Sequence, residues 1–161
     1  MEQTCIKHGG IELLDSIAQL WKKLNQLHAN QSVYFSDFYR GFTFADRKRD
    51  LIQKAETSDL QIALYLDATL GPIGYCVTTA QAREGEIDSI YVEYAHRNRG
   101  IGTALILDAI AWLNTQGINR IKVCVGAGNE AVFSFYQKFG IYPRVTILVD
   151  TNWHSTANDI L

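Results

Sequence analysis

The chain has 161 residues, of which 47% are hydrophobic and 20% charged, and its 15 Lys and Arg against 17 Asp and Glu give a net charge of −2. This length fits one ordinary domain that buries its own core without metals or disulfides. The sequence has no repeat and no linker, so we expect a single domain over residues 1–161. The near-neutral charge gives no reason to expect a nucleic-acid partner, which usually meets a strongly basic face.

The N-terminal sequence MEQTCIKHGG lacks the features of a secretory signal, and no uninterrupted apolar stretch reaches membrane-spanning length. We therefore expect no membrane association and a cytoplasmic location. The three cysteines are odd in number and far apart, and Cys76 and Cys124 lie within apolar runs. Buried free thiols in a reducing compartment are the expected state.

The sequence carries no pattern typical of a metal site. No histidine has metal-ligand spacing and no two cysteines form a C-x-x-C pair. We therefore expect no metal.

The first part of the chain predicts a short strand followed by helices. Residues 3–7 favour a strand, and apolar residues then recur at helical spacing from Ile11 through about residue 28. The aromatic and then charged stretch 32–57 predicts a second helical region, broken near Gly41. Its aromatic residues either pack the helices on a sheet, as we expect for most of them, or line a substrate site: Tyr34, Phe35, Phe38, Tyr39, Phe42 and Phe44.

The middle of the chain predicts three strands. Residues 60–67 and 71–80 are short, apolar and β-favouring, with a turn at 68–71 between them, which indicates an antiparallel hairpin. Residues 85–94 favour a third strand. A helix is predicted over 99–117, with the inward stripe Ile101, Leu105, Ala109 and Trp112 and a left-handed stop at Gly117.

The remainder predicts a buried strand at 120–125, a short helix at 129–140 ended by Gly140, and a final strand at 144–150. Three predicted strands precede the helix over 99–117, and strand, helix and strand then follow one another to the end of the chain. This order is typical of a mixed α+β fold whose sheet is antiparallel at first and partly parallel later.

The strongest local motif is the loop 97–103, which lies between a predicted strand and a long predicted helix. Its glycines let backbone amides approach a ligand, and the helix start adds free N–H groups and a positive dipole end. Arg97 and Arg99 add charge that suits a pyrophosphate. A tight turn with solvated arginines is the alternative. Neither a Walker motif nor the dinucleotide fingerprint fits, since Leu105 stands where the latter needs glycine.

With its flanks, this loop resembles the pyrophosphate loop of the GNAT superfamily of acyl-CoA-dependent N-acetyltransferases, Arg/Gln-x-x-Gly-x-Gly/Ala, filled here by Arg97, Gly100 and Gly102. A downstream match continues through Asn129, Ala131, Phe135, Tyr136, Lys138 and Gly140, and Ile141 replaces the usual Phe. The resemblance implies a GNAT-like fold: a central mixed, largely antiparallel sheet with a splayed centre, flanked by helices. It also implies acetyl-CoA as cosubstrate.

The resemblance implies which residues hold acetyl-CoA. The pantetheine arm pairs with main-chain groups of Ile90, Tyr91 and Val92, and the pyrophosphate lies on the loop. Asn129 contacts the cofactor arm, and the Tyr136 hydroxyl lies near the sulfur, where it protonates the leaving thiolate. From the residues alone, Tyr136 is equally a core aromatic and Asn129 an N-cap. The loop residues concerned are Arg97, Asn98, Arg99, Gly100, Ile101, Gly102 and Thr103.

Acetyl transfer also needs a group that takes the proton of the amine. Glu86 and Asp88 share one strand face by period-two alternation, with Ile90 and Val92 below them. Either carboxylate is a candidate base; the alternatives are a solvated strand face or a fixed attraction for a cationic acceptor. Cys124 has no histidine neighbour in sequence and is read as core.

The function expected is transfer of an acetyl group to the primary amine of a small molecule by direct attack in a ternary complex. A protein or peptide amine as acceptor, a non-catalytic acyl-CoA sensor and an unrelated nucleotide-binding protein stay open as alternatives. The acidic pair favours a cationic acceptor. A homodimer through the final strand and the tail is also possible.

Overall fold

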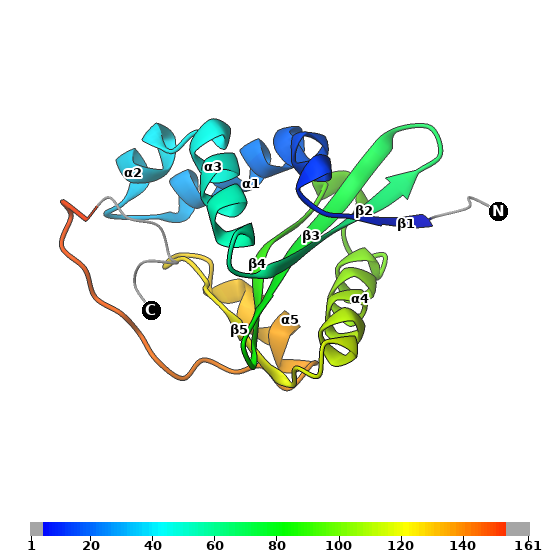
Figure 1. Ribbon diagram of the computed structural model, residues 1–161. Helices are drawn as coiled ribbons and strands as arrows, with labels where there is room; N and C mark the ends of the chain where they lie inside the picture. Colours follow the sequence, from blue (N-terminus) through cyan, green and yellow to red (C-terminus); the bar gives the residue numbers. More distant parts are fainter. Residues whose placement is uncertain (1–4, 154–161) are drawn as a thin grey trace.

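The computed structural model describes residues 5–153 and has a single sheet between two groups of helices (Figure 1). The sheet contains β1 (Cys5–Gly9), β2 (Asp59–Asp67), β3 (Gly71–Gln81), β4 (Glu84–Val92) and β5 (Arg120–Val123), in that spatial order. β1 with β2, β2 with β3 and β3 with β4 are antiparallel pairs, whereas β4 and β5 are parallel. The predicted mixed, largely antiparallel sheet and its hairpin are confirmed.

Helices from the first third of the chain cover one face of the sheet. A 3-10 segment (Ile11–Ile17) leads into α1 (Ala18–Gln31), followed by α2 (Ser36–Gly41) and α3 (Phe44–Ala55). The predicted break near Gly41 is confirmed, and Thr43 with Asp46 forms a capping box that starts α3. The predicted first helix begins as a 3-10 segment, in which Leu14 and Ile17 are both fully buried.

The second half of the chain covers the opposite face with α4 (Ile101–Thr115) and the short α5 (Phe133–Gln137). Gly117 has φ +73°, the left-handed stop that the sequence predicts. The inward stripe of α4 ends on Leu113 and not on the predicted Trp112, which is half-buried. The steps from Leu105 to Ala109 to Leu113 are four residues each, so they stay on one helix face.

Two hydrophobic cores result, one on each face of the sheet. The α1–α3 core is built around Leu14, Ile17, Trp21, Leu51, Tyr75 and Val77. The α4–α5 core is built around Cys76, Ile87, Leu105, Ile106, Ala109 and Tyr136. Tyr75, Cys76 and Val77 of β3 alternate between the two cores, as a strand covered on both faces requires.

The expectation of a buried strand at 120–125 is only partly correct. β5 stops at Val123, its residues are half-buried or exposed, and Cys124 is exposed and not core. Cys76, by contrast, is buried as expected. β5 ends at Val123 because its pairing with β4 stops at the pair Ile87 and Val123.

The expected final strand at 144–150 is wrong for this structure, because no strand is present between residue 141 and residue 153. The segment runs as an extended arm away from α5 (Figure 1), and Leu148 is 89% exposed. Its composition is typical of a strand, but strand propensity needs a partner edge to become structure. Most of the tail after it lies outside the described residues.

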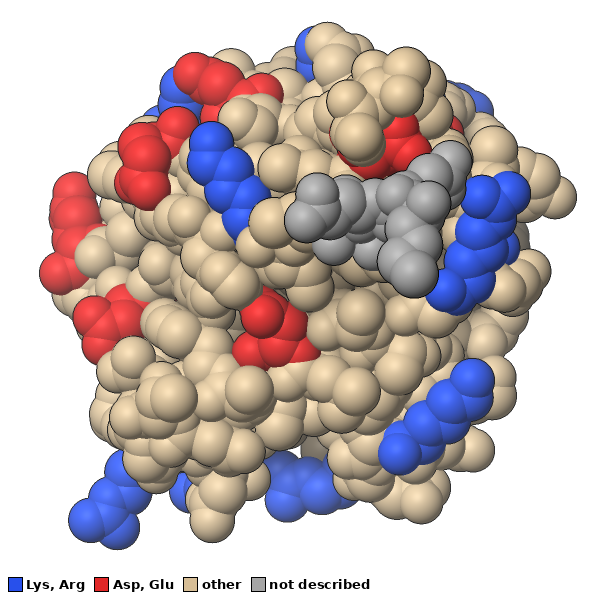
Figure 2. All heavy atoms as spheres, turned by 90° about the vertical axis from the view of Figure 1, so that its right-hand side faces the viewer, with Lys and Arg blue, Asp and Glu red and all other residues tan. Residues whose placement is uncertain are grey.

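Charged side chains of both signs lie interspersed among uncharged ones on the face shown in Figure 2. This distribution agrees with the near-neutral composition. Among residues 5–153, no helix is both long and apolar enough to cross a membrane.

Candidate active site

The sheet opens between β4 and β5. The two strands pair only from Glu84 to Ile87 on β4 and from Arg120 to Val123 on β5, although β4 continues to Val92. Within the described residues, the β4 edge over Ile90–Val92 therefore has no strand on its β5 side. This is the splayed centre implied by the resemblance, and it leaves main-chain groups of β4 available to a ligand.

A β-bulge lies in β4 at the start of this opening. Ile87 is opposite Thr78 and Ser89 is opposite Val77, so Asp88 is the extra residue. After the bulge the alternation of side chains is reversed. Ile90 and Val92 consequently pack in the α4–α5 core, whereas Glu86 and Asp88 point toward α3. Strict period-two alternation from the sequence does not foresee this reversal.

The loop before α4 has the backbone expected of an anion site. Asn98 has φ +61° and Gly100 has φ +80°, and a Cβ added at Gly100 would meet nothing within 4 Å. The helix start carries neither an acidic residue in its first turn nor a side-chain cap. Its first intrahelical bond runs from the Ala104 N–H to the Gly100 carbonyl, so the preceding N–H groups of the first turn are open to a ligand.

The two arginines of the loop have different surroundings. The Arg97 Nε donates to the Val92 carbonyl over 2.9 Å, and its guanidinium lies over the rings of Tyr91 and Tyr94, 5.1 and 5.5 Å from their centroids. Arg97 thus fixes the loop to the end of β4. Arg99 is exposed beside the open helix start, where its charge is free to meet an anion.

Both predicted carboxylates bind a lysine that sequence reasoning missed. The Lys54 Nζ of α3 lies 2.6 Å from Glu86 Oε2 and 2.5 Å from Asp88 Oδ1. The three side chains are 19%, 9% and 0% exposed, so the cluster is largely buried. Thr79 Oγ1 donates to the second Asp88 oxygen over 2.6 Å. No local sequence signal joins Lys54 to residues more than 30 positions away.

The neighbours of Asp88 act on its pKa in opposite directions. Burial and the neighbouring Glu86 charge raise the pKa of Asp88, and Lys54 and Thr79 counteract part of that rise. Cys124 is exposed as a residue, but its Sγ lies in a part-buried position 3.9 Å from Glu86 Oε1, where burial and then the Glu86 charge raise the pKa of the thiol. Cys124 therefore stays a thiol and not the thiolate that a nucleophile needs.

Tyr136 lies on the opposite side of the sheet from the carboxylates. It is 7% exposed within the α4–α5 core, and burial raises its pKa above the ordinary 10.0. The phenol therefore keeps its proton at neutral pH. Its neighbour Phe135 lies close to the loop, since a Cβ on Gly102 would approach the Phe135 ring to 3.4 Å.

The opening between β4 and β5 is where these groups can meet. The carboxylates lie on the α3 side of β4, and the loop and Tyr136 lie on the α4–α5 side. The fold thus places the two carboxylates on one face of β4 and Tyr136 on the other face, with the opening beside both.

Asn129 directly precedes a 3-10 turn (Glu130–Val132), but its side chain makes no capping hydrogen bond. The backbone N–H of Gly128 donates instead to the Glu130 carboxylate at 2.9 and 3.0 Å. The N-cap alternative for Asn129 is therefore not realised.

Most of the aromatic segment packs, as expected. Phe42 and Phe44 lie against Trp21, and Phe38 stacks on Phe42. Tyr34 is the exception and is 78% exposed. Across residues 5–153, no three His, Cys, Asp or Glu side chains gather as a metal site would require.

Replacing Lys54 with methionine should cost about 3 kcal/mol of stability at pH 7, because the buried Asp88 carboxylate then lacks its cation and Glu86 keeps only Lys122 at 3.8 Å. The pKa of Asp88 is already raised above 3.8, and removing Lys54 raises it further. When the pKa of Asp88 is higher in the folded than in the unfolded protein, protonation of Asp88 stabilises the fold at pH values below 3.8. This stabilisation is lost as the pH rises through the raised pKa of the folded protein. The deficit of Lys54→Met should therefore be largest at neutral pH and shrink toward pH 3.8, measured by urea unfolding.

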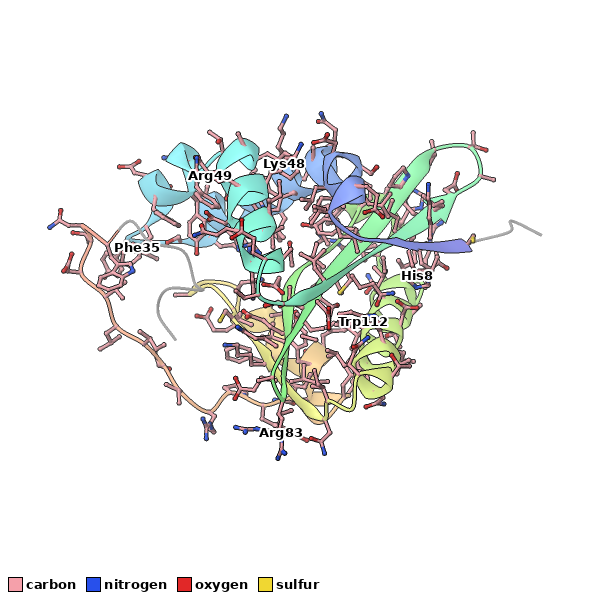
Figure 3. The ribbon with its side chains drawn as sticks, in the orientation of Figure 1. His8, Phe35, Lys48, Arg49, Arg83 and Trp112 are labelled. Atoms are coloured by element: carbon pink, nitrogen blue, oxygen red, sulfur yellow. The ribbon has the colours of Figure 1, made fainter. Side chains whose placement is uncertain are left out.

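Lys48→Met is the matched control on the same helix. Lys48 lies on the outer side of α3 (Figure 3) and pairs with Asp15 at 2.8 Å, with side chains 37% and 78% exposed. Exposed pairs contribute about 0.2–1 kcal/mol. Equal losses for both variants would contradict the role assigned to Lys54.

Comparison with known proteins identifies the class. The model of the Acetyltransferase (GNAT) family matches residues 21–141, which include most of α1, all of α2 to α5, the loop and the carboxylates. The chain therefore belongs to the GNAT family of acetyltransferases.

A curated relative, an uncharacterized N-acetyltransferase of Methanocaldococcus jannaschii, is 34% identical over 83 residues, which are 47% of this chain. The match spans only 37% of that relative's length.

Solved structures share the fold at low identity. The PaiA N-acetyltransferase of Thermoplasma acidophilum, solved with coenzyme A, has a TM-score of 0.68 at 18% identity, over 85% of this chain and 88% of that one. A GCN5-related N-acetyltransferase of Ralstonia eutropha has a TM-score of 0.71 at 18% identity, over 91% and 97%.

Proposed function

We propose that this chain, as one domain over residues 1–161, is an acetyl-CoA-dependent N-acetyltransferase that acts on the primary amine of a small molecule. The observation that carries the proposal is the opening between β4 and β5. It has an open anion-binding loop and a buried phenol on one side and two carboxylates on the other.

The proposed acetyl-CoA site follows the opening. The open N–H groups at the start of α4 and the Arg99 charge suit the pyrophosphate. The free edge of β4 over Ile90, Tyr91 and Val92 suits the amide groups of the pantetheine arm, which would pair with it like a short strand. The relative solved with coenzyme A supports this choice of ligand.

Once the acceptor ammonium has lost a proton and become a neutral amine, the reaction requires two further proton movements. The nitrogen of the amine attacks the thioester carbonyl, a C–N bond forms, the C–S bond breaks, and the nitrogen loses a proton. We assign that proton to Glu86 or Asp88, directly or through water. We assign protonation of the leaving thiolate to the Tyr136 hydroxyl, which burial keeps protonated.

Lys54 supports a cationic acceptor. Its ammonium group occupies the two carboxylates at hydrogen-bond distance, so this pair binds a primary ammonium group in the resting protein. An incoming acceptor ammonium would compete with Lys54 for the same oxygens. The exchange keeps an ammonium group beside Asp88, whose pKa is raised by burial and by the Glu86 charge, and this raised pKa suits a proton acceptor.

Titration calorimetry with acetyl-CoA, with ATP and NAD as controls, tests the proposal, followed by thiol release on a panel of amines. Binding of acetyl-CoA alone, with thiol release for a small cationic amine, is the expected result. Binding without release would favour an acyl-CoA sensor or a protein amine as acceptor. Preference for ATP or NAD would overturn the proposal.

A cytoplasmic location is part of the same proposal. Within residues 5–153 the cysteines are free, and one of them, Cys76, is buried with its pKa raised to about 12 by burial. Free thiols and acetyl-CoA as cosubstrate both suit a reducing compartment.

A further inference from the structure

The bulge in β4 leaves one residue without a strand partner. Asp88 is the extra residue, so within the described residues it pairs neither with β3 nor with β5, whose ladder with β4 ends at Ile87. A main-chain carbonyl in a sheet normally accepts a hydrogen bond from the neighbouring strand. The Asp88 carbonyl accepts one instead from the Arg47 side chain of α3, whose Nη2 lies 2.8 Å away. A helix side chain thus takes the place of a strand at this point.

Arg47 and Lys54 reach Asp88 from the same face of α3. They are seven positions apart, which is two helical turns, and Leu51 between them is fully buried in the α1–α3 core. Arg47 donates to the carbonyl of Asp88, and Lys54 donates to its carboxylate. Thr79 of β3 donates to the other carboxylate oxygen. Of these three donors, Arg47 is the one that acts on the main chain.

The start of α3 holds Arg47 ready for this contact. Its N–H donates to the Thr43 carbonyl over 3.1 Å, and the capping box of Thr43 with Asp46 fixes the turn from which the side chain extends. The Arg47 side chain is half-buried and ends in a rigid, planar guanidinium group. Little conformational freedom is therefore lost when it binds the carbonyl.

The arrangement of the proposed site depends on the position of this bulge. Before it, Glu86 points toward α3, and after it Ile90 and Val92 pack in the α4–α5 core. A shift of the bulge by one residue would turn the side chains that it passes to the opposite face of the strand. The two carboxylates would then no longer lie together on the α3 side of the opening.

We propose that Arg47 is a positioning residue for acetyl transfer, which holds the bulge in the register that places Glu86 and Asp88 beside the opening. This role rests on the proposed function, because it supports the acceptor side of that site. Arg47 donates to a carbonyl and to neither proposed proton acceptor, so it acts through the main chain of Asp88. Methionine at this position keeps the apolar stem and removes the donor, whereas lysine keeps one cationic donor.

Steady-state kinetics of Arg47→Met and Arg47→Lys test the role, with the amine that releases thiol in the panel. Turnover of Arg47→Met should fall about 10-fold, as expected for loss of one charge-assisted hydrogen bond. Its acetyl-CoA affinity in calorimetry should change much less, because the loop before α4 does not contact α3. Arg47→Lys should recover part of the turnover.

Arg49→Met is the matched control on the same helix. Arg49 is 69% exposed and pairs with Asp46 at 2.9 Å, so its loss should leave turnover unchanged. Unchanged turnover in Arg47→Met, or an equal loss in Arg49→Met, would overturn the proposal. A lysine variant as impaired as the methionine variant would contradict donation to the carbonyl as the cause.

Hydrogen exchange of the Ser89 amide tests the bulge without any assay of activity, because this N–H belongs to the same peptide group as the Asp88 carbonyl. In wild type it should exchange as slowly as the central amides of β3, and in Arg47→Met about 10-fold faster, with the amides of α4 unchanged. Rapid exchange of Ser89 in wild type, or equal exchange in the two proteins, would rule out the role of Arg47. A wild type that releases no thiol with any amine would reject the proposed function, and Ser89 exchange would still decide whether Arg47 holds the bulge.

Discussion

Gly100→Val should abolish detectable acetyl-CoA binding. Gly100 has φ +80°, and valine in a left-handed conformation costs about 1–2 kcal/mol. No protein atom lies within 4 Å of an added Cβ, so the new side chain would occupy the space beside the helix start where an anion would lie. Loss of two charge-assisted hydrogen bonds of about 1.5–3 kcal/mol each weakens binding about 100-fold or more.

Gly117→Val is the control that separates an effect on acetyl-CoA binding from an effect of backbone strain. Gly117 follows the other end of α4, has φ +73° and also has no atom within 4 Å of an added Cβ. Both variants should lose similar stability in thermal unfolding, but only Gly100→Val should lose acetyl-CoA binding in calorimetry. If Gly100→Val binds acetyl-CoA as wild type does, the loop is not the phosphate site.

Tyr136→Phe should lower turnover about 100-fold while leaving acetyl-CoA affinity nearly unchanged, because a general acid contributes at least that factor. Phenylalanine keeps the ring within the α4–α5 core, so the fold should stay intact. Because burial raises the pKa of Tyr136 above 10.0, wild-type turnover should show no alkaline loss from this group below pH 10.0. Steady-state kinetics and calorimetry on the same samples measure both quantities.

Tyr75→Phe is the control for removal of a buried phenol. The Tyr75 hydroxyl lies 2.6 Å from Ser89 Oγ in the α1–α3 core, on the other face of the sheet from Tyr136. Its loss should cost about 1 kcal/mol of stability and leave turnover unchanged. Unchanged turnover in Tyr136→Phe would remove Tyr136 as the acid and leave it as a packing residue.

Local patterns in the sequence determined most of the elements. The break near Gly41, the hairpin turn before Gly71 and the stop at Gly117 depend on neighbouring residues, so the sequence predicted where α2, β2 and α4 end. The open loop at Gly100 was readable for the same reason, since a glycine at a helix start acts through its own backbone. Membership of the GNAT family followed from this loop and its downstream partners.

Tertiary structure decided what depends on distant partners. The bulge at Asp88 is a property of the β3–β4 register, and it alone moves Ile90 and Val92 to the opposite face from the carboxylates. Lys54 reaches Glu86 and Asp88 only because α3 packs over β4, and no spacing in the chain encodes that approach. Residues 144–150 have the composition of a strand, but a strand forms only where a free edge receives it, and among residues 5–153 none does.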